Sequence, residues 1–174
     1  MTANIVPPAA VAVIGLGNMG VPMGACLIKA GFAVTGFDLS EAARANFAAA
    51  GGRAVADVAA AVSSADVVIT LLPNGKIVRE AVDSMRPHLK PGTIVIEMSS
   101  SAPLGTRKLG EGMIAAGYPF IDAPVSGGVK RAADGTLAIM VGGDPATIDR
   151  VDPVLAAMGR SIFRTRHRFP APTS

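Results

Sequence analysis

The chain of 174 residues contains no tryptophan, a single tyrosine and a single cysteine, Cys26. One cysteine has no partner within the chain, so we expect Cys26 to be a small core residue in a reducing, cytoplasmic environment. Long apolar runs are also missing, and the first ten residues lack the basic segment and apolar core of a signal peptide. These absences predict a soluble protein that is neither membrane-anchored nor secreted.

A basic surface with interleaved aromatic side chains is missing as well. The formal net charge is +3, but four of the eleven arginines lie in the last fifteen residues: Arg160, Arg164, Arg166 and Arg168. The rest of the chain is nearly neutral, so we expect no nucleic-acid partner. There are only two histidines, one in a helix-to-strand connection and one in the basic tail, and we predict no metal site.

What the chain has in abundance is small and apolar residues. Half of its residues are apolar, 17% are charged and 20 are glycine. The length suits one domain with a substantial core. This composition favours helices packed closely on both faces of a parallel sheet.

Strand-like and helix-like segments alternate along the chain. We predict strands at residues 11–14, up to Asp38, near Ala54, and at 67–71, 93–96, 120–121, 137–141 and 161–163. We predict helices at 19–30, 41–50, 57–62, 76–85, 103–116 and 145–158. The alternation predicts an α/β fold with a doubly wound, mostly parallel Rossmann-type sheet and helices on both faces. Residues 1–163 would form this domain, and residues 164–174 a divergent basic tail that we expect to be disordered.

The stretch at residues 11–40 has the order of a strand, a glycine turn, a helix and a second strand ending in an acid. Gly15 would allow the sharp exit from the strand, Gly17 the approach of a pyrophosphate, and Gly20 the close packing of the helix. The helix N-terminus, with unpaired N–H groups and the positive end of its dipole, suits the phosphates. The pattern predicts a dinucleotide-binding site.

Asp38 lies 18 residues after Gly20, at the end of the second strand. A carboxylate there accepts hydrogen bonds from both hydroxyls of the adenosine ribose, and it would repel a 2′-phosphate. No arginine occurs at residues 39–41. We therefore predict NAD as the cofactor in preference to NADP.

Three loops that follow predicted strands have unusual chemistry, at residues 72–75, 99–101 and 122–128. Ligands of doubly wound sheets bind outside the carboxyl ends of the strands, where these loops would lie. In the third loop, Ser126, Gly127 and Gly128 offer a hydroxyl and unhindered N–H groups that could bind a small carboxylate. The alternatives are that proline and glycine only turn the chain there, and that the serines of the second loop cap the helix near Pro103.

Five motifs together resemble the β-hydroxyacid dehydrogenases, a family that includes 3-hydroxyisobutyrate dehydrogenase, tartronate semialdehyde reductase and L-threonate dehydrogenase. They are GLGNMG at residues 15–20, LLPN at 71–74, EMSSSAP at 97–103, DAPVSGG at 122–128 and GTLAIMVGG at 135–143. The resemblance runs from residue 11 to about residue 163 and does not select one member. It implies NAD(P)-dependent hydride transfer between nicotinamide and a small 3-hydroxy acid or its semialdehyde.

The resemblance also implies roles for individual residues. The cofactor would be bound by Gly15, Leu16, Gly17, Asn18, Met19, Gly20, Asp38, Leu72, Pro73, Asn74 and Ser100. The substrate would be bound by Ser100, Ser126, Gly127 and Gly128. Family members are homo-oligomers, and this sequence leaves the oligomeric state open.

The catalytic lysine of the family has no counterpart here. The family places it on a long helix after a glycine-rich loop, in front of a C-terminal all-helical domain, and neither feature is found in this sequence. The five lysines are Lys29, Lys76, Lys90, Lys108 and Lys130. Only Lys130 lies near the predicted substrate loop, and an exposed loop lysine without a catalytic role is the simpler interpretation. We therefore name no catalytic residue.

Two explanations of the basic tail stay open: an out-of-frame reading of the family's glycine-rich loop, and a natural short form. In either case we expect a β-hydroxyacid dehydrogenase by ancestry whose 174-residue chain is inactive alone. The alternative is a non-enzymatic NAD-binding fragment or regulatory module.

Overall fold

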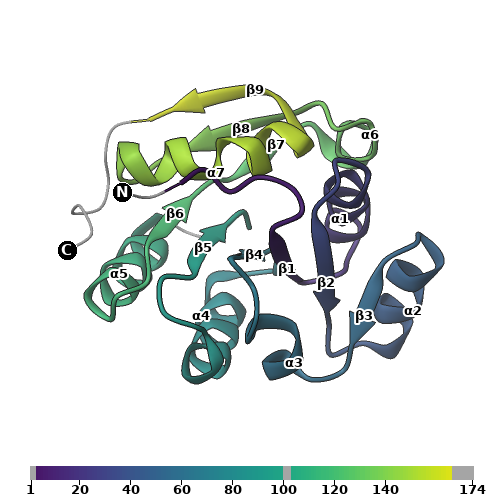
Figure 1. Cartoon of the computed structure of the whole chain (residues 1–174), viewed down its shortest axis with the longest axis horizontal. Helices are drawn as coiled ribbons and strands as arrows, with labels where there is room; N and C mark the ends of the chain where they lie inside the picture. Colours follow the sequence, from purple (N-terminus) through teal and green to yellow (C-terminus); the bar gives the residue numbers. More distant parts are fainter. Residues whose placement is uncertain (1–2, 100–102, 166–174) are drawn as a thin grey trace.

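The computed structural model describes residues 3–99 and 103–165, and its centre is a six-stranded parallel sheet (Figure 1). The strands are β1 (Ala10–Ile14), β2 (Ala33–Phe37), β3 (Arg53–Val55), β4 (Val67–Thr70), β5 (Ile94–Glu97) and β6 (Phe120–Asp122). Their order is β3-β2-β1-β4-β5-β6, and every neighbouring pair is parallel. The order reverses between β1 and β4, so a crevice opens there at the carboxyl ends of the strands.

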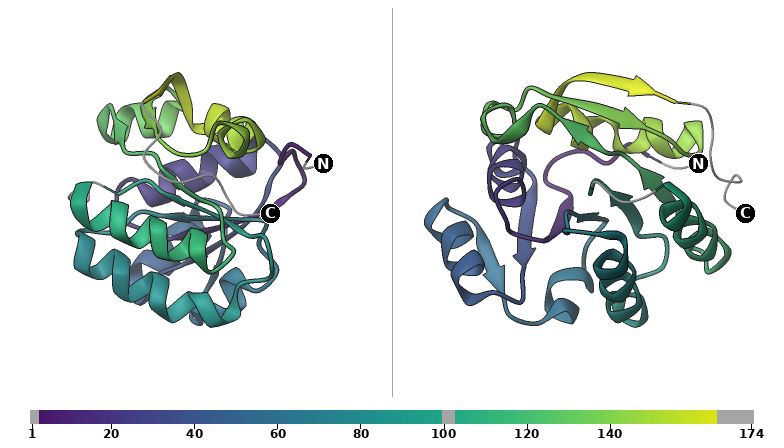
Figure 2. Two further views of the ribbon diagram at one scale, coloured as in Figure 1. Left: turned by 90° about the vertical axis from the view of Figure 1, so that its left-hand side faces the viewer. Right: turned by 180° about the vertical axis from the view of Figure 1, so that it is seen from behind.

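Helices cover both faces of this sheet, as predicted. The helices are α1 (Gly20–Lys29), α2 (Glu41–Ala49), α3 (Val58–Val62), α4 (Gly75–Met85), α5 (Pro103–Ala115), α6 (Gly128–Asp134) and α7 (Pro145–Met158), with the short 3-10 helix η1 (Arg86–His88). Buried side chains of α1 and α7 share one core cluster, and those of α3, α4 and α5 share the other. Figure 2 shows the two layers on opposite sides of the sheet. None of the helices in the described part of the chain is long and apolar enough to cross a membrane.

The last strands form a second sheet, which the sequence did not predict. Its strands are β7 (Val125–Ser126), β8 (Leu137–Val141) and β9 (Gly159–Arg164). β7 and β8 are antiparallel, and β8 and β9 are parallel. The segments predicted at residues 137–141 and 161–163 are strands, but expecting them to extend the main parallel sheet was wrong.

The chain leaves the main sheet at Pro124, which lacks the N–H needed to continue a ladder. It then turns through α6, which ends at Gly135 in the left-handed region with φ of 71°. An antiparallel bridge between Asp122 and Gly142 joins the two sheets. Both hydrogen bonds of this bridge are present, at 3.0 and 2.8 Å.

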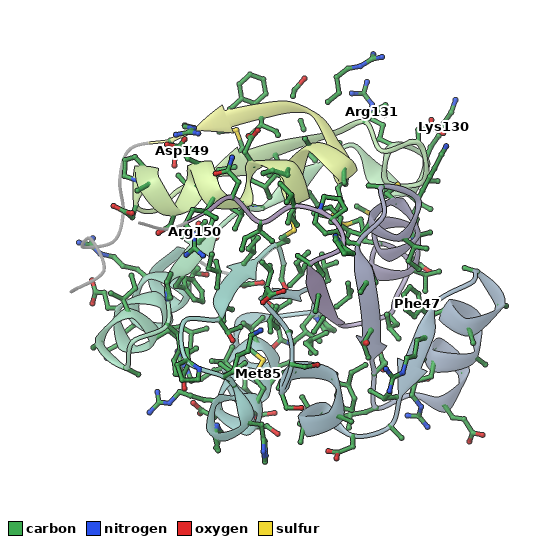
Figure 3. All side chains as sticks on the ribbon, viewed as in Figure 1. Phe47, Met85, Lys130, Arg131, Asp149 and Arg150 are labelled. Atoms are coloured by element: carbon green, nitrogen blue, oxygen red, sulfur yellow. The ribbon has the colours of Figure 1, made fainter. Side chains whose placement is uncertain are left out.

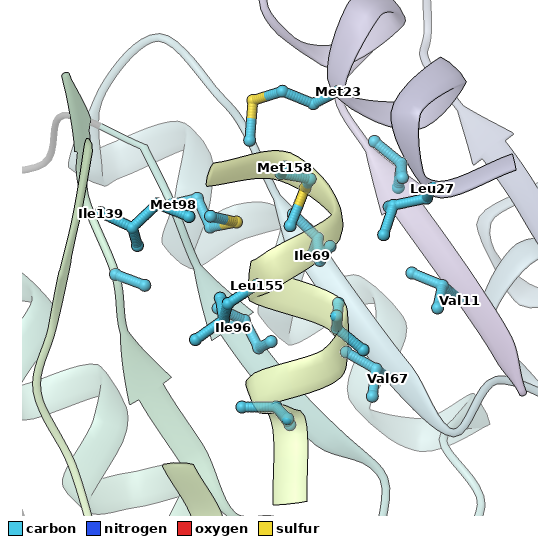
Figure 4. Close-up of a cluster of buried hydrophobic side chains, with 14 of the residues drawn as sticks. Val11, Met23, Leu27, Val67, Ile69, Ile96, Met98, Ile139, Leu155 and Met158 are labelled. Atoms are coloured by element: carbon cyan, nitrogen blue, oxygen red, sulfur yellow. The ribbon is translucent and has the colours of Figure 1, made fainter. Parts of the chain in front are cut away.

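Helix α7 lies between the two sheets (Figure 4). Its side chains Leu155 and Met158 are fully buried in the same cluster as Ile139 of β8 and Ile69 and Ile96 of the main sheet. Burial of each such side chain contributes about 1.5–3 kcal/mol. The second sheet is therefore bound to the main sheet through a shared apolar core.

The ring of Phe47 determines how closely α1, α2 and β2 pack (Figure 3). Phe47 is fully buried, and a Cβ added at Gly24, Gly36 or Gly52 would lie 2.4–2.7 Å from its ring. One of the six phenylalanines of this aromatic-poor chain thus occupies the space left by three glycines. This packing supports the β1–α1–β2 unit that carries the glycine turn.

Candidate functional site

A cleft of about 830 Å³ opens at the carboxyl ends of the main strands. Residues at or just beyond the ends of β1, β2, β4 and β5 line it: Ile14, Phe37, Leu71 and Met98. Of the residues predicted to bind cofactor or substrate, those lining the cleft are Gly15, Gly17, Asn18, Met19, Gly20, Asp38, Leu72, Pro73 and Gly128. Nine of the fourteen residues predicted to bind cofactor or substrate therefore lie on one continuous surface, and twelve further described residues line it.

The three glycines of the turn meet different surroundings. Gly15 has φ of +111°, and an added Cβ would lie 2.0 Å from the Leu71 carbonyl oxygen. A Cβ at Gly20 would lie 1.9 Å from the carbonyl oxygen of Gly15, so the start of α1 packs against the turn itself. A Cβ at Gly17 would have no described atom within 4 Å. Gly15 and Gly20 are therefore required by packing, whereas Gly17 leaves open space facing the cleft.

Helix α1 begins at this turn with its N-terminus directed to the cleft wall. Its N-cap residue is Met19, which within the described structure makes no capping hydrogen bond through its side chain. Ser, Thr, Asp or Asn at this position would occupy one of the free N–H groups. The N–H groups at this end therefore suit a ligand with negative charge, such as a pyrophosphate.

Asp38 links the end of β2 to the glycine turn. Its Oδ2 accepts a hydrogen bond of 2.9 Å from the Leu16 amide, and its Oδ1 accepts one of 2.8 Å from the Ser40 amide. The carboxylate is half-buried at the cleft wall. The side chain of Leu16 is 1% exposed and belongs to the core, so Leu16 contributes to this site through its backbone amide.

Sequence reasoning missed Arg44, which lies in α2 close to the same loop. Its Nη1 donates hydrogen bonds to the carbonyl oxygens of Asp38, at 2.8 Å, and Leu39, at 3.2 Å. This arginine is six residues beyond Asp38 and therefore outside residues 39–41, where no arginine occurs. The first turn of the following helix is where such a residue would have been found.

Sequence reasoning also missed one face of α4. Ile77, Glu80, Ala81 and Ser84 line the cleft, together with Val58 of α3. The intervals of three, four and seven residues place these α4 side chains on one helix face. The sequence shows by this spacing that the four residues share a helix face. It does not show that this face borders the cleft, because that depends on the tertiary fold.

The loop after β4 reaches the cleft through Leu72 and Pro73. Asn74 instead caps α4, because its Oδ1 accepts a hydrogen bond of 3.0 Å from the Ile77 amide. It is not among the cleft-lining residues. Its observed contact is thus structural.

The loop predicted to bind the substrate carboxylate reaches the cleft only in part. Gly128 lines the cleft, whereas Ser126 and Gly127 are exposed and absent from its lining. Ser126 ends β7, and Gly127 packs against the side-chain stem of Arg131. Ser100, predicted to contact both cofactor and substrate, lies outside the described residues.

None of the five lysines, all in the described part of the chain, lines the cleft. Lys130 is exposed and lies on helix α6, so the expectation of a loop lysine was wrong about its local structure. Figure 3 shows Lys130 and Arg131 extending outward from α6. Over residues 3–99 and 103–165, no cluster of three or more His, Cys, Asp or Glu side chains is arranged to hold a metal ion.

Residues 10–166 match the family described as the NAD binding domain of 6-phosphogluconate dehydrogenase. The chain is 44% identical over 156 residues to NAD-dependent L-serine dehydrogenase of Pseudomonas aeruginosa, covering 88% of this chain and 52% of that protein. It is 43% identical over 153 residues to a probable 3-hydroxyisobutyrate dehydrogenase of Mycobacterium tuberculosis, with the same two coverages. The chain thus spans about half the length of these relatives.

Solved structures also match most of this chain and little more than half of their own length. The 3-hydroxyisobutyrate dehydrogenase of Mycobacterium tuberculosis with L-serine superposes with a TM-score of 0.90 at 41% identity, covering 92% of this chain and 55% of that one. Psf3 in complex with NADP+ and 2-OPP superposes with a TM-score of 0.83 at 26% identity, covering 93% and 57%. The family match over residues 10–166 contains the strands of both sheets.

Proposed function

Because the chain belongs to the family of the NAD binding domain of 6-phosphogluconate dehydrogenase, we propose that its cleft binds NAD as the cofactor half of a hydroxyacid dehydrogenase. The observation that carries this proposal is the glycine turn. Gly17 leaves open space in the wall of the cleft, beside the N-terminus of α1 and the Asp38 carboxylate. A dinucleotide needs all three features within one surface.

The residues present fit a nicotinamide dinucleotide. The N–H groups of the turn and of the start of α1 would hold the pyrophosphate, and Asp38 the adenosine ribose. Leu72 and Pro73 would line the far side of the cofactor, and Asn74 would fix the start of α4. When bound, the nicotinamide supplies a carbon that accepts or donates a hydride.

The proposed preference for NAD over NADP rests on charge. The Asp38 carboxylate at the cleft wall would repel a 2′-phosphate. Arg44 is a cation near the same loop, but its Nη1 already donates to two backbone carbonyls. The carboxylate is held by two amides and lines the cleft, so we expect its effect to dominate.

We infer that the substrate class is a small acid with a hydroxyl on its β-carbon. Serine and 3-hydroxyisobutyrate, named in the relatives, share this chemistry. Gly128 at the cleft wall supports a carboxylate site in this loop, to which Ser126, Gly127 and Ser100 would contribute. In this proposal residues 1–163 are the cofactor domain.

For the 174-residue polypeptide alone we propose binding without turnover. Oxidation of an alcohol requires a base within hydrogen-bond reach of its hydroxyl proton. The resembled family uses a lysine as this base, and none of the five lysines here, all of them described, lines the cleft. The same observation favours a second candidate function, an NAD-binding module without enzymatic activity.

An absorbance assay at 340 nm tests this proposal, with saturating NAD and 3-hydroxyisobutyrate, L-serine, L-threonate or glycerate as substrate. We expect no rate above the rate without protein. Turnover that disappears in a Lys130→Met variant would assign the base to α6 and contradict the proposal. Turnover that survives this substitution would assign the base elsewhere and contradict it equally.

A further inference from the structure

A carboxylate is fully buried at the end of β5, next to the cleft but outside its lining. Glu97 is 0% exposed, and its Oε1 accepts a hydrogen bond of 3.0 Å from the Thr70 hydroxyl. The same oxygen accepts a hydrogen bond of 2.7 Å from the Ser99 amide. Burying a carboxylate is costly unless it is well bonded, so its position beside a ligand site calls for an explanation.

Ser99 carries the connection on to the loop after β4. Its hydroxyl donates to the Thr70 carbonyl oxygen at 3.3 Å and accepts a hydrogen bond of 2.7 Å from the Leu72 amide. Ser99 and Leu72 both line the cleft. Two cleft-lining residues from different loops are therefore connected to one buried carboxylate.

The hydrogen-bond network of Thr70, Glu97, Ser99 and Leu72 lies at the carboxyl ends of two neighbouring strands, β4 and β5. Thr70 and Glu97 are partners in the last register position of the β4–β5 ladder. Beyond them the Met98 amide still donates to the Thr70 carbonyl oxygen, at 3.0 Å. The side chains of Glu97 and Ser99 hold the two loops together where the strands themselves end.

The network lies on one side of the glycine turn. Asp38, proposed to bind the adenosine ribose, follows β2, whereas Leu72 and Ser99 follow β4 and β5. β2 and β4 flank β1 on opposite sides. A dinucleotide crosses the glycine turn after β1 with its adenosine half on one side and its nicotinamide half on the other. Because Asp38 lies on the adenosine side, the network is on the nicotinamide side.

We propose that Glu97 is a positioning residue for the nicotinamide half of the cofactor, acting through Ser99 and Leu72. This inference rests on the proposed function, because it requires NAD in the cleft. It goes further by assigning a role to a residue that does not itself touch the ligand.

The test compares Glu97→Leu and Thr70→Val with the unmodified chain by calorimetric titration with NAD and with ADP. ADP carries the adenosine half and both phosphates, so it reports the other side of the cleft. Thr93→Val is the matched control, because Thr93 is also a buried threonine (1% exposed) next to β5. Its hydroxyl donates to the carbonyl oxygens of Ala65 and Lys90, at the opposite end of the strand.

We expect the dissociation constant for NAD to rise at least about tenfold in Glu97→Leu and about fivefold in Thr70→Val. The dissociation constant for ADP should change less than about twofold in both. Glu97→Gln keeps an oxygen acceptor and should bind NAD nearly as well as the unmodified chain. Thr93→Val should leave the ratio of the two constants unchanged, even where it lowers the unfolding temperature.

If Glu97→Leu and Thr70→Val lose affinity equally for NAD and ADP, or lose no affinity for NAD, the proposed role of Glu97 is overturned. Thr70→Val keeps the shape of the side chain and decides the matter if Glu97→Leu does not fold. Failure of the unmodified chain to bind NAD would overturn the proposed function itself. The two proposals therefore fail by different results.

Discussion

Several side chains at this site hold the backbone in place through hydrogen bonds. Asp38 uses both carboxylate oxygens on backbone amides, and one of these belongs to Leu16 in the glycine turn. The motif made Asp38 and the glycines predictable from sequence, since strand, turn and acid are close in the chain. The contact between Ser99 and Leu72 was not predictable, because it depends on how strands 27 residues apart align.

Removing the charge of Asp38 should weaken cofactor discrimination. We expect Asp38→Asn to narrow the preference for NAD over NADP by about tenfold, because repulsion of the 2′-phosphate is lost and Arg44 stays nearby. Titration with both cofactors measures the ratio. Asp83→Asn, an exposed substitution on α4 outside the cleft lining, should leave the ratio unchanged. An unchanged ratio in Asp38→Asn would show that this carboxylate does not select the cofactor.

The Asp66–Lys90 ion pair should contribute stability that depends on pH. Burial raises the pKa of Asp66, but hydrogen bonds from Lys90 (2.7 Å) and the Ala10 amide (2.9 Å), with the charge of Lys90, lower the pKa below 3.8 overall. A depressed pKa stabilises the fold above the unfolded-state value, and this stability is lost as pH falls through the folded-state pKa.

We therefore expect Lys90→Met to lower the free energy of unfolding at pH 7 by up to about 1 kcal/mol, because the pair is partly exposed. Urea denaturation at pH 7 and at pH 3 measures the difference from the unmodified chain. The difference should shrink at pH 3, whereas Lys108→Met should show none at either pH. A difference that is the same or larger at pH 3 would rule out the ion pair as its source.

At the scale of helices and strands, local patterns predicted nearly every element. Strand β8 and helix α7 have the predicted bounds, and most others differ by one or two residues at their ends. The sequence did not predict β7 and α6, because the proline and the two glycines of residues 122–128 favour a loop there. It also could not predict the second sheet, since strand pairing depends on the edges available in three dimensions.

Packing around Phe47 makes a prediction about α1, α2 and β2. A Cβ at Gly36 would lie 2.7 Å from the Phe47 ring and 2.9 Å from Leu16 Cδ2, both fully buried. We expect Gly36→Ala to lower the free energy of unfolding by about 1–3 kcal/mol. Denaturation in urea, with Gly112→Ala as the control, measures this loss.

Gly112 lies in α5 with no described atom near its would-be Cβ, so its substitution should be neutral or stabilising. In a Phe47→Leu background, Gly36→Ala should cost less than in the unmodified chain, since the ring no longer fills the space. Equal costs in the two backgrounds would mean that contact with Phe47 is not the cause.

At the scale of the molecule, the residues proposed to bind the cofactor come from separate parts of the chain and line one cleft. The reversal of strand order between β1 and β4 brings together the glycine turn, Asp38 and the loops after β4 and β5. None of the five described lysines lines this cleft, so we expect the polypeptide to bind the cofactor without turnover.

The central claim is that the glycine turn binds the pyrophosphate of NAD, and calorimetric titration of Gly17→Ala with NAD tests it most directly. Gly17 faces open space, so the variant should fold and melt like the unmodified chain but bind NAD at least about tenfold more weakly. Gly112→Ala, the same substitution in α5, should bind NAD normally. Undiminished binding in Gly17→Ala would contradict the assignment of the cleft.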